Sequence, residues 1–230
     1  MLQNSTSCIK VSNNHSCPLC KSQSIIKNGT TKNKKQQYHC KNCNKRFIDF
    51  YTHKAHQPST NNSIILLTKE GLGIRSTARI LRISTTTLLK RIIAIAASIV
   101  QPAITKAKTY EVDEMRTFIR RKEKLTWIVY ALERETKKVV SFNVGPRTNK
   151  TLNFVLKSLK LSQAKRIFTD GLKNYKYLIE STVHNLKRFS NNHIERKNLT
   201  VRTHLKRLNR RTICFSKSST ILTAILRIYF

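Results

Sequence analysis

Two Cys-x-x-Cys pairs constrain the amino-terminal part of this chain more than any other feature. Cys17 and Cys20 form the first pair and Cys40 and Cys43 the second, with nineteen residues between the pairs. This spacing is typical of four-cysteine zinc sites, in which two tight turns close a tetrahedron of thiolates and leave no position for a substrate. We therefore expect structural Zn²⁺ at these four cysteines. A redox Cys-x-x-Cys motif would normally lie in a βαβ context, which is missing here.

The residues around the cysteines predict a small zinc ribbon over residues 1–55, with a flexible start. Ile25–Ile26 and Gln37–Tyr38 are expected as strands of a hairpin, with Asn28–Gly29 as its turn. Two aromatic residues, Phe47 and Phe50, are expected to cover the core of the ribbon. Two histidines remain as alternative zinc ligands, His15 and His39.

The charge of the chain indicates a nucleic-acid partner. Its 45 lysines and arginines outnumber 11 acidic residues, for a formal net charge of +34, and the excess is spread over both halves. Such a surplus repels itself unless a polyanion neutralises it, and duplex DNA carries one phosphate charge per ~1.7 Å. The longest apolar run, 92–100, is too short to span a bilayer, and the polar start lacks a signal-peptide core. We expect a cytoplasmic bacterial protein associated with double-stranded DNA and with no membrane partner.

Residues 60–100 predict a helix-turn-helix. Apolar residues in 64–67 begin a first helix, the segment 71–73 breaks it, and 74–81 returns to helical spacing. Ser84 is expected to cap a third helix over 85–100, which would enter the major groove. The residues of this helix expected to contact DNA are Thr85, Thr86, Thr87, Lys90 and Arg91. The alternative is a helical hairpin that only packs against the rest of the chain.

Residues 101–108 read as a linker, and residues 109–230 predict an α/β catalytic domain. The expected strands are 109–115, 125–132, 138–144 and 166–169, and the expected helices are 149–159, 175–180 and 194–209. This order favours a mixed sheet flanked by helices.

Three carboxylates of this domain fall where they could converge on one face of the sheet. Asp113 lies in the first strand, Asp170 at the end of a later strand, and Glu195 at the start of a helix. Carboxylates brought close together require a cation, and hard oxygen ligands favour Mg²⁺ or Mn²⁺, which support phosphoryl transfer. The alternative is surface pairing with lysine and arginine, as expected for Glu123, Glu133, Glu135 and Glu180.

The same carboxylates lie in segments that resemble the catalytic blocks of the insertion-sequence-one family of transposases. These segments are Tyr110–Met115, Phe168–Gly171 with Tyr175, and Asn192–Asn198; 145–148, 203–208 and 214–218 also resemble the family. The resemblance implies a ribonuclease-H-like DDE domain with Asp113, Asp170 and Glu195 as the metal-binding triad. It also implies an amino half that binds the terminal inverted repeats, cleavage by water followed by strand transfer by the 3′-hydroxyl, and a homodimer or higher synaptic assembly.

Four further residues are assigned supporting roles. Arg202 lies seven residues after Glu195 on the same helix face, where it is expected to hold a phosphate, and Asn198 is expected to orient a ligand or contact DNA. Tyr175 and Trp127 are candidates for stacking on an unpaired base, with core packing favoured for the tryptophan.

Two other functions remain open at this point. A tyrosine recombinase would use the His204-x-x-Arg207 pattern with Tyr229 as nucleophile, and a non-enzymatic repressor would use residues 1–100 alone. Arg116 stands where many relatives carry an aromatic residue, and the sequence stops within an expected helix, which fits an inactive or truncated copy. Both halves in one reading frame instead favour a full-length product.

Overall fold

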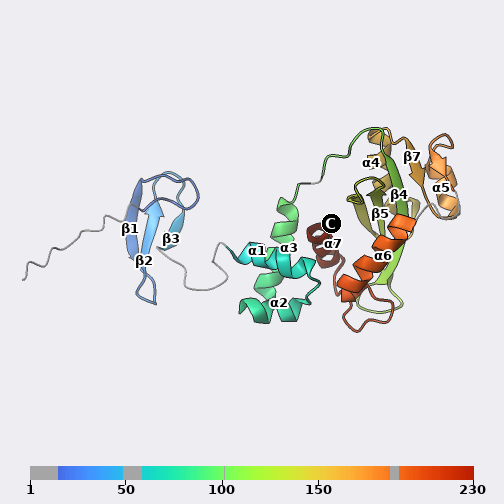
Figure 1. Cartoon of the computed structure of the whole chain (residues 1–230). Helices are drawn as coiled ribbons and strands as arrows, with labels where there is room; N and C mark the ends of the chain where they lie inside the picture. The colour runs from blue at the N-terminus through green and yellow to red at the C-terminus, as the bar shows by residue number, and fades with distance from the viewer. Residues whose placement is uncertain (1–14, 49–58, 101, 187–191) are drawn as a thin grey trace, which may run out of the picture. The chain divides into compact units, whose positions relative to one another are not determined.

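The computed structural model of the chain describes residues 15–48, 59–100, 102–186 and 192–230. The chain divides into two compact units, 1–57 and 58–230 (Figure 1). No helix among the described residues is long and apolar enough to cross a membrane.

The first unit contains a three-stranded antiparallel sheet of β1 (Ile25–Thr30), β2 (Gln36–Cys40) and β3 (Arg46–Ile48). Its small core is built on Tyr38, whose ring stacks on Phe47 with 5.6 Å between the centroids. The hairpin turn lies at 31–35, where the Thr31 amide donates to the Lys35 carbonyl. The prediction of a turn at Asn28–Gly29 is therefore wrong. Both residues lie inside β1, where the pairing register shifts and Gly29 adopts a φ of +72°; the predicted role of Phe50 lies outside the described residues.

The second unit begins with α1 (Thr60–Lys69), α2 (Ile74–Leu81) and α3 (Thr85–Ser98), close to the bounds that the sequence predicts. Ser84 caps α3 as expected, because its hydroxyl accepts a hydrogen bond from the Thr87 amide at 3.0 Å. Gly71 ends α1 with a φ of +75°, and a Cβ atom there would lie 2.0 Å from the His204 carbonyl oxygen. Glycine is required at this turn for both reasons.

The apolar face of α3 packs against α7 (Ser219–Tyr229), which also contacts α1. The buried side chains of α3 are Leu88, Ile92, Ile95 and Ala96, and those of α7 include Leu222, Ile225 and Leu226. The Arg227 side chain adds a hydrogen bond of 3.4 Å to the Ala96 carbonyl. The last helix of the sequence thus completes the core of the helix-turn-helix.

A five-stranded sheet forms the centre of the second unit (Figure 1). Its strands are β4 (Thr109–Phe118), β5 (Leu125–Glu133), β6 (Val139–Gly145), β7 (Arg166–Phe168) and β8 (His184–Asn185). The spatial order is β6-β5-β4-β7-β8; β4, β5 and β6 form an antiparallel meander, while β7 and β8 continue from β4 in parallel. This is the ribonuclease-H-like arrangement that the resemblance implies. The two-residue strand β8 is absent from the sequence-based prediction.

The helices of this domain are α4 (Asn149–Leu161), α5 (Lys173–Leu178) and α6 (Asn192–His204), followed by a 3₁₀ turn, η2 (Lys206–Leu208). The predicted helix over 194–209 therefore ends earlier, at His204. Leu205 departs from helical dihedrals, and η2 follows it.

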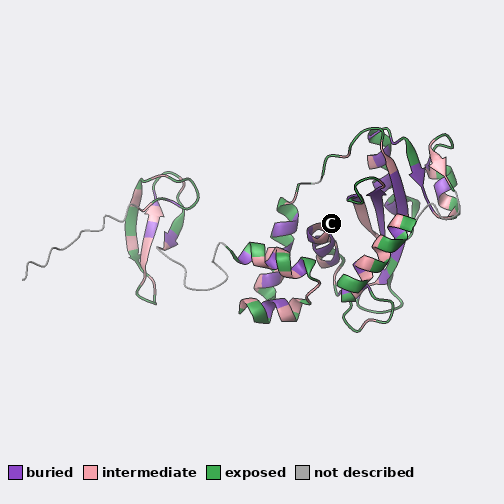
Figure 2. Ribbon diagram, in the orientation of Figure 1, coloured by how far each residue is buried: buried purple, intermediate pink, exposed green. Residues whose placement is uncertain are grey.

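Alternation along β4 separates two environments. Tyr110 and Val112 point into a buried cluster with Leu152 and Leu159 of α4, and the central strands are buried along most of their length (Figure 2). Glu111 and Asp113 point the other way, toward α6, because successive side chains of a strand alternate between faces. Acidic side chains are thereby concentrated on the α6 face of the sheet.

Candidate active site and DNA-binding surface

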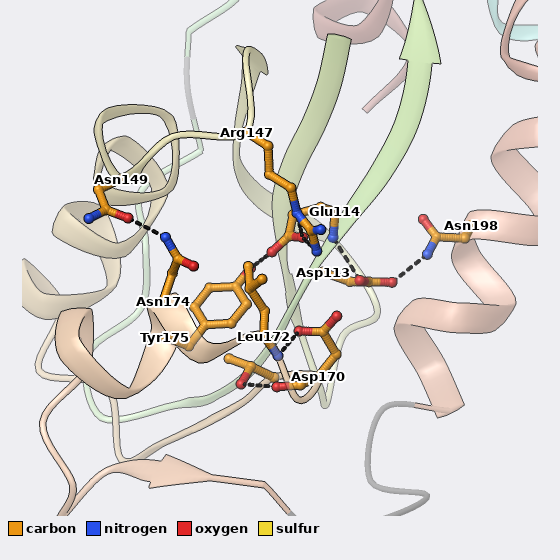
Figure 3. Close-up of polar contacts among 10 residues, drawn as sticks. Asp113, Glu114, Arg147, Asn149, Asp170, Leu172, Asn174, Tyr175 and Asn198 are labelled. Atoms are coloured by element: carbon orange, nitrogen blue, oxygen red, sulfur yellow. Dashed lines mark hydrogen bonds and ion pairs between the residues drawn. The ribbon is translucent and has the colours of Figure 1, made fainter. Parts of the chain in front are cut away.

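Asp113 lies in the middle of β4 and is held on both carboxylate oxygens. Its Oδ1 accepts from the Glu114 amide at 2.7 Å, and its Oδ2 accepts from the Asn198 side-chain amide at 2.7 Å (Figure 3). Burial, together with the nearby charge of Asp170, raises the pKa of Asp113 to about 6. The two hydrogen bonds act in the opposite direction. Burial and the neighbouring acid make ionisation of Asp113 costly, and a bound cation would stabilise the ionised carboxylate.

Asp170 follows β7, the parallel neighbour of β4, and this pairing brings it beside Asp113. Its Oδ1 accepts a hydrogen bond from the Leu172 amide at 3.1 Å, which fixes the turn into α5 (Figure 3). Two of the three predicted carboxylates are therefore neighbours at the centre of the sheet.

Glu195 lies exposed on the first turn of α6. Within the described parts of the chain, the one group of three or more His, Cys, Asp or Glu residues able to hold an ion is the cysteine cluster. The expected convergence of all three carboxylates is thus seen for two of them. Glu195 and Asn198 are three residues apart and share a helix face, so Glu195 is on the side of α6 that carries Asn198 to Asp113.

Glu111 attaches the start of α6 to the sheet, a role that the sequence analysis did not assign. Its fully buried carboxylate accepts a hydrogen bond of 2.8 Å from the Ile194 amide and lies 3.3 Å from the Arg134 guanidinium. A carboxylate at a helix amino terminus is favoured by the free amides there. This contact attaches the backbone to the sheet one residue before Glu195.

Glu114, Arg147 and Tyr175 form a second polar cluster that the sequence analysis missed. The Arg147 guanidinium pairs with the buried Glu114 carboxylate at 2.8 Å, and the Tyr175 hydroxyl also donates to it (Figure 3). Tyr175 is fully buried, so the prediction that it stacks on an unpaired base is wrong. Glu133, expected at the surface, is also buried, with a hydrogen bond of 2.8 Å from Thr136.

Trp127 of β5 differs from its expected place in the core. The side chain is half-buried and lines an open pocket. The Arg147 Cζ atom lies over the ring, 4.5 Å from its centroid. The tryptophan is therefore available at the surface of the site.

Tyr130 contacts Asn198 directly, and Phe230 packs on Tyr130. Tyr130 pairs with Asp113 across β4 and β5, and its hydroxyl donates to the Asn198 Oδ1 atom at 2.8 Å. The Phe230 ring stacks on Tyr130 with 5.6 Å between the centroids. Asn198 therefore uses both ends of its amide inside the protein, and its contact with DNA stays a prediction.

Arg202 lies one further turn along α6. Its guanidinium donates to the carbonyls of Leu208 at 3.0 Å and Arg116 at 3.4 Å. Burial and the nearby Arg210 lower its pKa, and Asp113 is among the charges that act on it. The phosphate-holding role of Arg202 stays a prediction.

The four cysteines of the ribbon gather at one point. Their sulfur atoms lie within 4.8 Å of one another, with 3.5 Å for the pairs Cys17–Cys43 and Cys20–Cys40. A tetrahedron with Zn–S bonds of ~2.3 Å places sulfur atoms about 3.8 Å apart, so this donor set fits zinc. Backbone donors at Cys20 and Leu19 lower the pKa of Cys17 to about 6, which favours the thiolate that binds metal. His15, an alternative zinc ligand in the sequence-based prediction, is not part of the four-cysteine group among the described residues. Its Nε2 atom lies 3.3 Å from the Tyr38 hydroxyl.

The predicted DNA-contacting residues lie on the amino-terminal part of α3. Thr85, Thr86 and Lys90 are exposed, while Thr87 and Arg91 are half-buried. The Arg91 guanidinium donates to Asn61 of α1 at 2.6 Å, which ties α3 to the first helix. The exposed polar and basic side chains fit a helix that enters the major groove.

A ribonuclease-H-like sheet with paired aspartates, preceded by a helix-turn-helix, defines the class of DDE-type transposases. Residues 107–230 match the family described as IS1 transposase, and residues 51–93 match the family described as InsA C-terminal domain. The chain belongs to the IS1 family of transposases.

Individual relatives agree with this family. The chain is 35% identical over 108 residues to the insertion element iso-IS1n protein InsB of Shigella dysenteriae, covering 47% of this chain and 82% of that protein. It is 33% identical over 119 residues to the insertion element IS1 2 protein InsB of Escherichia coli, covering 52% of this chain and 71% of that protein. A solved structure, the simian T-cell lymphotropic virus intasome with PP2A regulatory subunit B56 gamma, matches with a TM-score of 0.39 and 14% identity over 72% of this chain and 65% of that chain.

Membership of the IS1 family of DDE-type transposases argues against the tyrosine-recombinase alternative. His204 and Tyr229 do lie together, with 2.8 Å between His204 Nδ1 and the Tyr229 hydroxyl. Tyr229 belongs to α7, however, where this contact ties the end of α7 to the end of α6. We interpret it as a structural contact.

Proposed function

We propose that this protein binds the terminal inverted repeats of an insertion sequence and catalyses metal-dependent DNA cleavage and strand transfer. The observation that carries the proposal is the pair Asp113, in β4, and Asp170, just after the neighbouring parallel strand β7, with a pKa of Asp113 that is raised in part by the charge of Asp170. Such a pair is costly without a cation and is suited to phosphodiester chemistry with one.

The chain's own residues would divide the work as follows. Asp113 and Asp170 would hold Mg²⁺ or Mn²⁺, with Glu195 approaching from the first turn of α6. Bound there, the divalent cation supplies Lewis-acid polarisation of the scissile phosphate and activation of the attacking oxygen. Asn198 would keep Asp113 oriented toward the cation, and Arg202 would hold a neighbouring phosphate. The attacking group would be water at the element end and then the freed 3′-hydroxyl at the target.

Recognition of the ends would rest on the amino half. The exposed residues of α3 would reach base edges, and the ribbon, folded around structural Zn²⁺, would add contacts to the same DNA. Cleavage at two ends requires their synapsis, so we propose a homodimer or higher assembly on DNA.

The experiment is a cleavage and strand-transfer assay on DNA that carries the inverted repeats of the element, with Mg²⁺ or Mn²⁺. Asp113→Asn, Asp170→Asn and Glu195→Gln should each lower both reactions at least about a hundred-fold while end binding stays unchanged. Glu180→Gln is the matched control, because Glu180 pairs with Lys160 at the surface. Full activity in any of the three variants would remove that residue from the triad. End binding with no cleavage by the unmodified protein would support the repressor alternative instead.

A further inference from the structure

An open pocket of about 460 Å³ adjoins the candidate active site. It lies between β4, β5, the end of α6 and the segment after η2. Its walls include Glu114, which follows Asp113 in β4, and Arg202, on which the charge of Asp113 acts. The pocket therefore borders Asp113 through its chain neighbour Glu114 and through Arg202.

The charges of this pocket are unbalanced. Four cations line it, Arg116, Lys122, Arg202 and Arg210. The acid in the lining, Glu114, is already neutralised by Arg147 at 2.8 Å. Among the residues that the structure describes, the four cations form no ion pair with a carboxylate.

The neighbouring cations of the pocket act on Arg202. Burial and then Arg210 lower its pKa, and Arg116 acts in the same direction. Like charges that line one pocket repel each other, and an anion placed among them would offset that cost. The pocket is thus prepared for a negatively charged ligand.

An aromatic surface accompanies the cations. The half-buried indole of Trp127 lines the pocket. The Arg147 guanidinium lies over one face of the ring and is itself paired with the Glu114 carboxylate. Cations that follow a backbone, combined with an aromatic ring for a base, are the pattern of single-stranded nucleic-acid sites. The volume is in the ~300–1,000 Å³ range of small-ligand sites and too small for a duplex.

We propose that this pocket binds one unpaired nucleotide of the DNA strand that enters the active site, with the base on Trp127 and the phosphate among Arg116, Arg202 and Arg210. This inference rests on the proposed function, since it takes DNA as the substrate of the neighbouring aspartates. It adds that the duplex is opened beside the reacting phosphate, and that the displaced base is held by the protein.

Trp127 is the single tryptophan of the chain, which makes the test direct. The fluorescence of the full-length protein is titrated with a short single-stranded oligonucleotide and with a blunt duplex of the same length, without Mg²⁺ so that no cleavage occurs. We expect saturable quenching by the single strand and much weaker quenching by the duplex. Binding of the single strand without quenching would overturn the proposal.

Variants separate this pocket from general charge attraction. By anisotropy of a labelled single strand, Trp127→Ala should weaken binding about five- to a hundred-fold, whereas Trp127→Phe retains most of the affinity. Arg210→Ala should reduce the salt dependence by about one phosphate contact, and the exposed neighbour Arg211, outside the pocket lining, is the matched control. Equal losses in Arg210→Ala and Arg211→Ala would contradict a defined site.

The outcome is distinguishable from that of the proposed function. Quenching without cleavage would leave the pocket in place and count against catalysis. Cleavage that depends on Asp113, without quenching, would leave the catalytic proposal standing and remove the nucleotide site.

Discussion

The side-chain amide of Asn198 donates a hydrogen bond of 2.7 Å to Asp113, from a helix that starts 74 positions after the end of the strand carrying the aspartate. Asn198 is held in turn by the Tyr130 hydroxyl at 2.8 Å. The orientation of the central carboxylate is thus controlled by two neutral side chains that have no proton to exchange near neutral pH.

Loss of this hydrogen bond should slow catalysis more than binding. In Asn198→Ala, Asp113 loses a donor that lowers its pKa, so the acidic limb of the pH–rate profile should move to higher pH. Tyr130→Phe should produce a smaller shift in the same direction, because Asn198 then remains but is less well fixed. The measurement is the cleavage rate between pH 5 and 9 at saturating Mg²⁺. An unchanged profile in Asn198→Ala would show that the contact is only structural.

Asp113 should reduce stability at neutral pH when no metal is bound. Its folded-state pKa of about 6 is above the value of an unfolded aspartate, so the folded protein binds more protons between the two values and stability falls as pH rises through this window. Asp113→Asn should therefore stabilise the metal-free protein at pH 7–8 by ~1–2 kcal/mol. At pH 4 the difference should nearly vanish. Thermal unfolding at the two pH values tests this, and Mg²⁺ should stabilise the unmodified protein alone.

The cysteine cluster predicts a zinc-dependent fold for the ribbon. Cys17→Ser or Cys40→Ser should abolish stoichiometric zinc and unfold the ribbon, because both thiols are buried in its core and structural zinc supplies folding free energy. Zinc content and the circular dichroism of the isolated first unit are the measurements. Cys214→Ser is the control, since this cysteine is exposed and outside the cluster. Retained zinc in Cys17→Ser would favour a histidine ligand.

Lys90 on α3 should contribute phosphate affinity without sequence information. Lys90→Ala is expected to weaken binding to all DNA and to reduce the salt slope by about 1, while Thr86→Ala should alter the preference among end sequences. Exposed Lys157 on α4 provides the matched charge control. Equal effects of Lys90→Ala and Lys157→Ala would argue that α3 is not the reading helix.

The packing of α7 on the helix-turn-helix predicts a stability effect far along the sequence from α3. Leu222→Ala, at a fully buried position, should cost about 2–5 kcal/mol and weaken end binding. Thr220→Ala, exposed near the start of the same helix, should be close to neutral. Denaturant unfolding followed by DNA titration checks both variants. Unimpaired stability in Leu222→Ala would contradict the packing.

Local patterns were sufficient for most of the elements. Alternation and turn residues predict β4, β5 and β6 within a few residues, and the Ser84 cap predicts the start of α3. Where prediction failed, the cause was tertiary. Gly29 resembles a turn residue but allows a bulge, and two-residue β8 has no pattern of its own.

In the candidate site, too, local sequence patterns were predictable and tertiary contacts were not. The segments around Asp113 and Asp170 are visible in the sequence because strand ends and motif spacing are local properties. The burial of Tyr175, by contrast, depends on a partner 61 residues away, Glu114, and no local signal distinguishes it from an exposed tyrosine. Glu111 was equally undetectable, since its role appears only when the start of α6 lies against β4.

The position of α7 has a consequence for synthesis. Translation completes α3 at Ser98, but α7 begins only at Ser219, so at ~5–20 residues per second the partner of α3 follows roughly 6–24 s later. Throughout that interval the growing chain has no α7 to cover Ile92 and Ile95. The core of the helix-turn-helix is therefore completed only after residues 99–218, which include strands β4 to β8, have been synthesised.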